Sequence, residues 1–425
     1  MINLGFKTPM LKGMVCAAAL LLVACSEQGG SNSADAEKDN SVEAIHKRVV
    51  TLDTHVDIHE DMTFDPVYDP GTNTPQQVDL GKMEAGGLDS AFFIVYVGQG
   101  PRDEAGYAMA KEKALRKFSA IHRMTEFYPE RIGFAYTPDE FEDIAASGRK
   151  VASIGIENGY VIGKDLSLIE DFHNRGARYM TLAHNGHNDI CDSAQPLARL
   201  GDVPEEHGGV SDYGYKVIDE MNRVGMMVDI SHVSINCMMQ ATKYSKAPVI
   251  ASHSGVWALS KHVRNLNDEQ LKALAASGGV VQIVGLDEFA KYYPEKQPEV
   301  DALRAIVVAA NGGTEWDSEV YGKDPAYLAG MEELNKKYPP ANVKDFVDHI
   351  DYAVKLIGID HVGISSDFDG GGGLNGWNSA TETMNVTKEL VARGYTEEEI
   401  AKIWSGNTIA LWRRVNAVAD QLQGK

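Results

Sequence analysis

Short runs of apolar residues recur along the whole chain, and longer stretches with mixed apolar and polar positions separate them. A short apolar run is typical of a buried β-strand, whereas a longer amphipathic stretch is typical of a surface helix. There are eight such runs, at residues 49–54, 90–97, 151–156, 179–183, 225–231, 248–252, 278–285 and 361–366. Eight strands that alternate with helices predict an α/β fold, namely a (β/α)8 TIM barrel that extends from residue 45 to residue 425.

Polar side chains that can bind a metal or move a proton lie at the ends of six of these runs. They are His55, Asp57, Glu157, His184, His232, His253 and Asp367. In a (β/α)8 barrel the carboxyl ends of the strands meet at one rim, which carries the catalytic residues. One histidine at a strand end is most often a packed residue, but six independent coincidences are improbable. We therefore expect these side chains to form one site.

The chemical types in this set indicate which metal would bind. His55 and Asp57 are two residues apart on a strand, so they point the same way and can chelate one ion. A ligand set of three imidazoles and two carboxylates, drawn from these seven side chains and without a cysteine, suits catalytic zinc or a similar divalent metal better than a structural zinc site. Five ligands exceed the need of one four-coordinate zinc with an open position. Two ions that share a carboxylate would use all five and generate a hydroxide between them.

Several segments that carry these residues resemble one known family. The most specific are 220–234 (EMNRVGMMVDISHVS), 251–268 (ASHSGVWALSKHVRNLND) and 360–370 (DHVGISSDFDG). Further matching segments are 51–62, 78–97, 154–160 and 179–185. From about residue 45 onward the chain is thus similar to the renal (membrane) dipeptidase family of binuclear zinc peptidases, including its bacterial members. The resemblance implies a barrel of the metal-dependent hydrolase type.

The resemblance also implies a site with two Zn²⁺ ions per subunit. His55 and Asp57 would bind one ion, and His232 and His253 would bind the other. Glu157 would bridge the two ions. Related amidohydrolases often use a carboxylated lysine as the bridge, and no expected strand end in this sequence presents a lysine. This difference favours the dipeptidase branch.

Three further residues match the substrate and catalytic positions of the family. The resemblance implies that His184 contacts the tetrahedral intermediate and that Arg264 binds the terminal carboxylate of the substrate, as a guanidinium fork can. Asp367 would be the catalytic acid and base. The alternative for Arg264 is a surface salt bridge to Asp268 or Glu269. The alternative for Asp367 is the orientation of a ligand histidine.

The expected reaction is hydrolysis of the peptide bond of a dipeptide with a free C-terminal carboxylate. The resemblance implies that L-Xaa-L-Xaa and L-Xaa-D-Xaa substrates are both accepted. Two alternatives stay open: hydrolysis of a related amide, such as an N-acyl amino acid or a β-lactam-like ring, and a non-catalytic binding lipoprotein. Degenerate relatives usually lose metal ligands, and none is missing from this sequence.

The N-terminus has the pattern of a bacterial lipoprotein signal peptide, residues 1–24. Lys7 and Lys12 precede an apolar run that is too short for an ordinary transmembrane helix. The sequence Leu-Val-Ala-Cys at 22–25 matches a lipobox. We expect cleavage before Cys25 and acylation of its thiol. An ordinary secretory signal with a different cleavage site is the alternative.

The segment after this cysteine predicts how the domain would be attached. Residues 26–41 contain no large apolar side chain, so the block 25–44 is expected to be a lipidated cysteine with a flexible tether. Ser26 resembles the pattern of outer-membrane sorting. The expected location is the cell envelope of a Gram-negative-type bacterium, facing the periplasm, with the lipid anchored in the outer membrane.

The net charge of the chain limits the classes of macromolecule that it can bind. The chain has a formal net charge of −21, which disfavours nucleic acid and anionic membrane surfaces as partners. Any attraction for an anionic substrate must therefore be local to Arg264 and the metals.

Cys191 and Cys237 are the cysteines left in the folded domain, and an oxidising compartment would allow them to pair. The sequence does not decide whether they do.

One long connection interrupts the expected barrel after its seventh strand. Residues 286–343 form an aromatic-rich insertion where related enzymes have a shorter segment. Its aromatic residues include Phe289, Tyr292, Tyr293, Trp316, Tyr321, Tyr327 and Tyr338. Loops after barrel strands lie on the catalytic face, and long ones are often lids. A lid, a contact in a homodimer and a surface subdomain are the alternatives.

Overall fold

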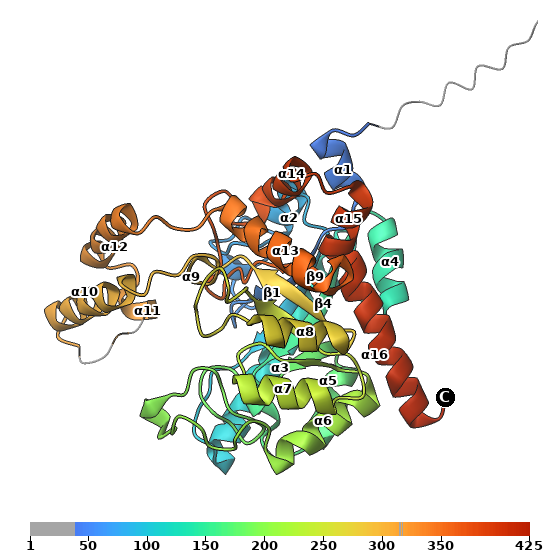
Figure 1. The fold of residues 1–425 in the computed structure, drawn as a ribbon, viewed down its shortest axis with the longest axis horizontal. Coiled ribbons are helices and arrows are strands. Elements are labelled where there is room, and N and C mark those ends of the chain that lie inside the picture. The colour runs from blue at the N-terminus through green and yellow to red at the C-terminus, as the bar shows by residue number, and fades with distance from the viewer. Residues whose placement is uncertain (1–38, 314–315, 317) are drawn as a thin grey trace, which may run out of the picture. The chain divides into compact units, whose positions relative to one another are not determined.

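The structure, a computed structural model, describes residues 39–313, 316 and 318–425. The predicted signal peptide, the predicted lipidation site Cys25 and most of the predicted tether lie outside the described residues. One compact unit spans Asn40–Lys425 and contains the whole barrel (Figure 1). Its first helix is α1 (Val42–Arg48), which therefore starts inside the last residues of the predicted tether.

Eight parallel strands form the barrel that the apolar runs predict. They are β1 (Leu52–Asp57), β2 (Ser90–Tyr96), β4 (Lys150–Glu157), β5 (Ala177–Thr181), β6 (Met227–Asp229), β7 (Ile250–Ser254), β8 (Val280–Val284) and β9 (Val362–Ser365). Each strand pairs in parallel with the next in this order. A parallel bridge from Val56 to Phe368, with a hydrogen bond of 2.9 Å from Asp57 N to Phe368 O, joins the two ends. The barrel is nearly closed, and the predicted fold is confirmed.

A ninth strand lies outside the barrel path. It is β3 (Ile132–Phe134), which pairs only with β4. The sequence analysis does not predict it, because three residues are too few to show a strand periodicity. The extra strand extends the sheet next to β4 and adds no residue to the rim.

Helices surround the strands and bury their apolar faces against them (Figure 1). They are α2 (Leu80–Gly86), α3 (Glu104–Phe127), α4 (Pro138–Ala146), α5 (Ser167–Asn174), α6 (Asp212–Val224), α7 (Ile235–Tyr244), α8 (Asp268–Ala276), α13 (Val343–Ile357), α14 (Met384–Ala392), α15 (Glu397–Ala401) and α16 (Asn407–Gln423). The end of α6 shows how the sequence sets these boundaries. Gly225 takes a left-handed conformation (φ 86°) that stops the helix and turns the chain into β6.

The predicted insertion is mostly helical. It contains α9 (Asp287–Ala290), α10 (Lys296–Ala310), α11 (Ser318–Tyr321) and α12 (Pro325–Lys337). Helices α10 and α12 pack against each other and lie to the left of the labelled strands in Figure 1. Its first helix, α9, contains Phe289, whose ring lies beside Arg264.

Candidate metal centre and active site

The carboxyl ends of the strands bring the seven predicted polar residues to one rim of the barrel. Four of them belong to strands, namely His55 and Asp57 in β1, Glu157 in β4 and His253 in β7. The other three follow β5, β6 and β9 after one or two residues, namely His184, His232 and Asp367. All seven fall into three overlapping groups, and within each group the candidate ligand atoms lie within 4.8 Å of one another. The strand ends therefore converge as the sequence predicts.

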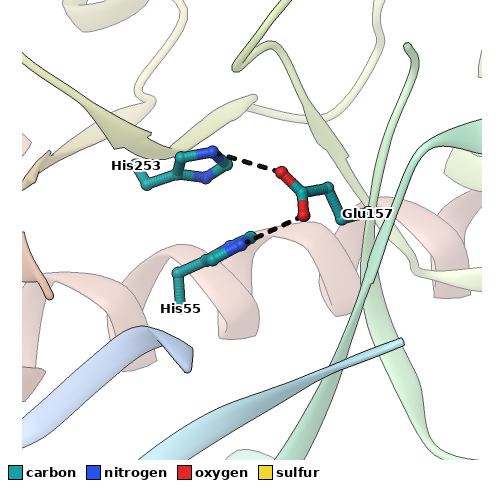
Figure 2. A group of neighbouring side chains, drawn as sticks. All are labelled: His55, Glu157 and His253. Carbon is teal, nitrogen blue, oxygen red and sulfur yellow. Dashed lines mark ion pairs between the residues drawn. The ribbon is translucent and has the colours of Figure 1, made fainter. Parts of the chain in front are cut away.

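Glu157 lies at the centre of this arrangement. Figure 2 shows its carboxylate between His55 and His253. Its Oε2 atom is 3.4 Å from Nε2 of His55. Its Oε1 atom is 2.9 Å from Nε2 of His232, 3.4 Å from Nε2 of His253 and 3.6 Å from Nε2 of His184. One oxygen of the carboxylate thus faces His55, and the other faces three further imidazoles.

A second set of carboxylates surrounds His55. Its Nε2 atom is 3.6 Å from Oδ2 of Asp57 and 3.9 Å from Oδ1 of Asp367. On the opposite side of Glu157, Nε2 of His232 and Nε2 of His253 are only 2.8 Å apart. Two imidazole lone pairs at this separation repel each other unless a proton or a cation lies between them. The group around His55 and the pair of His232 and His253 therefore each favour a positive charge, either a proton or a cation, between their side chains.

Burial and mutual repulsion shift the acidity of these groups. Burial and the neighbouring Glu157 raise the pKa of Asp57 to about 6, and burial with both carboxylates raises the pKa of Asp367 well above its usual range. Burial alone would lower the pKa of His55, but Glu157, Asp57 and Asp367 outweigh it and raise that pKa to about 9. The cluster is therefore a concentration of negative charge that attracts protons or cations.

The other imidazoles respond to burial in the opposite direction. Burial lowers the pKa of His232 and of His253 well below the ordinary value, and Arg264 adds to this effect. Burial also lowers the pKa of His184 to about 4. These imidazoles are neutral at physiological pH, and neutral imidazole is the form that binds a metal.

The backbone near the cluster is strained at two of these residues. His232 and Asp367 have positive φ values of 66° and 60°, a region that side chains other than glycine rarely adopt. Such a conformation costs about 1–3 kcal/mol and is found mainly where the surrounding structure enforces it, often at functional sites. The strain supports a functional role for these two positions.

The donor set fits a first-row divalent metal. Among the described residues, Nε2 of His55 is a buried nitrogen without a hydrogen-bond partner. A buried polar atom without a partner is unfavourable, and a metal ion at this position would satisfy it. Imidazoles and carboxylates without cysteine thiolates match catalytic zinc and similar ions. The residues present therefore fit a metal centre.

Arg264 lies beside the cluster and not on the surface. Its side chain is only 3% exposed, so the alternative of a surface salt bridge to Asp268 or Glu269 is wrong. Its Nη2 atom donates a long hydrogen bond of 3.3 Å to the carbonyl of His253, and its Nε atom has no partner among the described residues. The guanidinium centre is 5.3 Å from the centre of the Phe289 ring in α9. Arg264 thus keeps unused donors near the cluster.

One residue at the site is missed by the sequence analysis. Tyr96, the last residue of β2, is paired in register with Glu157, and its ring centre is 4.8 Å from that of His184. Burial, Glu157 and Asp57 raise the pKa of its hydroxyl, which therefore stays protonated. The expected strand 90–97 ends in Tyr-Val, and an aromatic residue with a polar tip at a strand end is the signal that would have found it.

The two remaining cysteines do not form a disulfide in this structure. Cys191 and Cys237 are both free and fully buried. Their thiols contact each other, and burial with this contact raises the pKa of Cys237 well above its ordinary value. Thiols in such a setting are poor nucleophiles.

Within the part of the chain that the structure describes, no helix is long and apolar enough to cross a bilayer.

The chain matches known proteins over almost all of its length. The family model of membrane dipeptidases (peptidase family M19) matches residues 39–425. Dipeptidase tcpJ of Claviceps purpurea is 30% identical over 369 residues, which cover 86% of this chain and 75% of that protein. Dipeptidase aclJ of Aspergillus oryzae is 30% identical over 356 residues, which cover 81% and 72%.

Solved structures agree with these matches. The crystal structure of the probable dipeptidase PvdM from Pseudomonas aeruginosa has a TM-score of 0.79 and 32% identity, and the match covers 89% of this chain and 98% of that one. A metallo peptidase from Rhodobacter sphaeroides, liganded with a phosphinate mimic of the dipeptide L-Ala-D-Ala, has a TM-score of 0.67 and 21% identity, with 86% and 99% covered. The latter supports the fold. With its metal-binding rim and its match to the family model, the chain belongs to the membrane dipeptidase family, peptidase family M19, and is a metal-dependent dipeptidase.

Proposed function

We propose that the protein hydrolyses dipeptides that have a free C-terminal carboxylate and an L- or D-residue in second position, with two Zn²⁺ ions per subunit. The observation that carries this proposal is the position of Glu157, whose two oxygens face different histidines. A single ion would need one of these oxygens. A second oxygen that faces a second group of ligands supports a carboxylate bridge between two ions.

The four proposed ligands other than Glu157 would divide equally between the two ions. His55, which faces Oε2 of Glu157, and Asp57, whose Oδ2 atom is 3.6 Å from Nε2 of His55, would hold one ion. His232 and His253, which share the Oε1 side, would hold the other. When bound, two such ions supply Lewis acidity at the scissile carbonyl and a nucleophile from water near neutral pH.

Arg264 would bind the terminal carboxylate of the dipeptide. It is buried beside the cluster and donates one long hydrogen bond to the backbone, so its guanidinium fork can still donate two parallel hydrogen bonds to a carboxylate. Burial lowers the pKa of Arg264 only to about 10, so the side chain keeps its positive charge at neutral pH. A substrate with an amidated C-terminus would lose this charge pair.

Asp367 would move the proton that the reaction requires. The nitrogen of a peptide bond is a poor leaving group unless it is protonated, so a residue must take a proton from the attacking water and give it to the amine. Asp367 is buried, 3.9 Å from His55, and its pKa is raised, so it can hold a proton between these steps. His184, which packs against Tyr96, would contact the oxygen of the tetrahedral intermediate.

A substrate panel tests this proposal. Purified protein is assayed with L-Ala-L-Ala, L-Ala-D-Ala, their C-terminal amides and N-acetyl-L-alanine, before and after treatment with a chelator. We expect hydrolysis of both free dipeptides, slow reaction of the amides and of the N-acyl amino acid, and loss of activity on chelation. Faster hydrolysis of N-acetyl-L-alanine than of either dipeptide would replace the proposal by the amidohydrolase alternative.

We also propose that Cys25 carries a lipid that anchors the protein at the periplasmic side of the outer membrane. The support is the lipobox pattern, since one acyl-modified cysteine is an attachment that needs no spanning helix. In cells that process lipoproteins, Cys25→Ser should release the protein from the membrane fraction or leave it unprocessed. Unchanged membrane fractionation, together with no lipid label on the wild type, would rule out this anchor.

A further inference from the structure

Two of the proposed ligand histidines have their second ring nitrogen in the interior of the barrel. The Nε2 atoms of His55 and His253 face Glu157, so the Nδ1 atoms point away from the cluster. A metal-binding imidazole needs its proton on the nitrogen that does not bind the metal. The partner of each Nδ1 atom therefore decides whether the other nitrogen can be a ligand.

The hydroxyl of Tyr179 is the partner of His55. It lies 3.0 Å from Nδ1 of His55 and donates a hydrogen bond of 2.9 Å to the carbonyl oxygen of Thr54. A carbonyl oxygen only accepts, so the single proton of the phenol is used there. The remaining contact requires that Nδ1 of His55 carries a proton and donates it to the phenol oxygen. In the neutral form of His55, Nε2 then carries the lone pair, and this nitrogen faces Glu157.

The hydroxyl of Ser252 has the same role behind His253. It donates a hydrogen bond of 2.6 Å to Oδ2 of Asp229 and lies 2.9 Å from Nδ1 of His253. Because the serine proton goes to the carboxylate, Nδ1 of His253 must donate. Asp229 is itself fixed, since its Oδ1 atom accepts from the backbone N–H groups of Ser231 (3.0 Å) and Ser252 (2.9 Å).

These contacts are isolated from water. Tyr179, Ser252 and Asp229 are all completely buried, and they come from three neighbouring strands or strand ends, β5, β7 and β6. Buried hydrogen bonds are held in a low dielectric, where a wrong tautomer would leave a donor or an acceptor without a partner. The arrangement therefore keeps the Nδ1 proton of each imidazole in place, so that the neutral, metal-binding form has its lone pair on Nε2.

We propose that Tyr179 and Ser252 are positioning residues that fix the Nδ1–H tautomers of His55 and His253, so that each prepares one of the two metal ions, with Asp229 holding Ser252. The inference rests on the two-ion site of the proposed function. Tyr179 and Ser252 would not bind metal themselves. Substitution of Tyr179 should weaken the binding of one ion, and substitution of Ser252 should weaken the binding of the other. Loss of such a partner typically lowers metal affinity about 10- to 100-fold.

The experiment measures stepwise zinc affinity. Metal-free wild type, Tyr179→Phe, Ser252→Ala and the double variant are titrated with zinc against a competing chelator, which resolves two dissociation constants per chain. Tyr160→Phe is a matched control, because it removes a phenol whose hydroxyl donates to the carbonyl of Pro101 and not to a proposed ligand histidine. Ser153→Ala is the second control, because it removes a buried hydroxyl without a hydrogen-bond partner among the described residues.

We expect Tyr179→Phe to weaken one of the two binding steps about 10- to 100-fold and Ser252→Ala to weaken the other by a similar factor. The double variant should be weakened in both steps, while the controls keep both wild-type constants. Unchanged constants in both variants, or equal losses in variants and controls, would overturn the inference. Each variant tests its own ion, so a variant that does not fold leaves the other to decide.

The same titration separates this inference from the function on which it rests. If the wild type binds two zinc ions and the variants behave like the controls, only the roles of Tyr179 and Ser252 fail. If the wild type binds fewer than two ions, the two-ion site itself fails. A purely structural role of the hydroxyl groups would lower the unfolding temperature of the metal-free protein without a selective change in one binding step.

Discussion

The rim of the barrel and the insertion after β8 are stabilised in opposite ways. At the rim, charged and polar groups such as Glu157 and Asp229 are buried, and strained residues such as His232 are held by strands on both sides. In the insertion, α12 has no buried residue, and Ile306 and Leu328 are 65% and 53% exposed. In its later part, α10 to α12, there are local contacts: α10 packs against α12, and an aromatic group forms around Trp316.

The difference shows that groups which destabilise the fold are found at the rim and not in the exposed helices of the insertion. Buried carboxylates and left-handed backbone destabilise a fold, and they persist only where many neighbours enforce them. The barrel supplies these neighbours at the strand ends, whereas the exposed helices of the insertion do not. We therefore expect substitutions at the rim to affect catalysis and those in α10–α12 to affect mainly local stability.

The largest effect is expected at Asp367. Asp367→Asn removes the proton transfer to the leaving amine but leaves the proposed ligands in place, so kcat should fall at least about 100-fold with two ions retained. Asp369→Asn is a matched control, because Asp369 also has a positive φ but accepts hydrogen bonds from the backbone of Gln77 and Val78. Kinetics and metal analysis of both variants check this. If Asp367→Asn loses zinc and regains normal turnover at saturating zinc, Asp367 instead orients a ligand histidine and does not transfer the proton.

A second substitution tests substrate binding at the rim. Arg264→Ala should lower kcat/KM for free dipeptides by about 2–5 kcal/mol, or roughly 30-fold and more, because a buried charge pair with the substrate carboxylate is lost. Zinc content should not change. C-terminally amidated dipeptides are the internal control, since the wild type and the variant should hydrolyse them at similar, low rates. Equal rates of the wild type on free and amidated substrates would remove Arg264 from this role.

His349 connects the two regions and gives a smaller effect. Its Nδ1 atom accepts a hydrogen bond of 2.9 Å from the N–H of Val256, two residues after β7, and its Nε2 atom donates one of 3.0 Å to the carbonyl of Ala290 in α9. His349→Ala would leave both backbone groups without this partner, at a cost of about 1–3 kcal/mol in the free energy of unfolding. Chemical denaturation at neutral to mildly alkaline pH measures it.

The same residue predicts a pH dependence with a definite sign. Burial lowers the pKa of His349 below its ordinary value of 6.5, so below that pH the unfolded chain binds a proton more readily than the folded one. The contribution of neutral His349 is therefore complete above about pH 6.5 and decreases as the pH falls towards the lowered pKa. The difference in stability between wild type and His349→Ala should be larger at pH 8 than at pH 5.5. A difference that grows on acidification would contradict this assignment.

The smallest effect is expected in the insertion. Trp316→Ala removes ring contacts with Tyr321 and Tyr327 and the contact with Arg304, and aromatic pairs of this kind contribute about 0.5–1.5 kcal/mol. We expect faster proteolysis within 296–337 and kcat/KM values within a factor of about two of the wild type, since none of these three partners is a proposed site residue. A large loss of kcat/KM would show that the insertion acts as a lid on the rim.

The barrel and the convergence of the rim residues could be predicted from the sequence because both follow from local patterns. An apolar run specifies a buried strand, and the parallel order of a barrel places all strand ends at one rim. Thus His55 and Glu157, which are far apart in the chain, could be expected in one site. The short strand β3 and helix α12 of the insertion lack such a pattern, because β3 has only three residues and α12 has no buried face.

Contacts between distant side chains could not be predicted. The sequence shows nothing that joins Tyr179 to His55 or Phe289 to Arg264, since these pairs depend on the twist of the barrel and on the path of the rim loops. The burial of Arg264 is of the same kind, because a polar loop sequence is compatible with an exposed or a buried arginine. Backbone strain at His232 is also invisible in the sequence, because only the packing of the neighbouring strands enforces it.

The central claim is that Glu157 lies between two metal ions, and metal analysis of the active protein tests it most directly. Protein purified without chelator is reconstituted with zinc, freed of excess metal, and analysed for zinc per chain and for dipeptide hydrolysis in the same samples. We predict close to two zinc ions per chain, with activity that is lost on removal of metal and returns on its restoration, and no stable second ion in Glu157→Ala. Full activity in wild-type protein with one zinc ion or none would contradict the account.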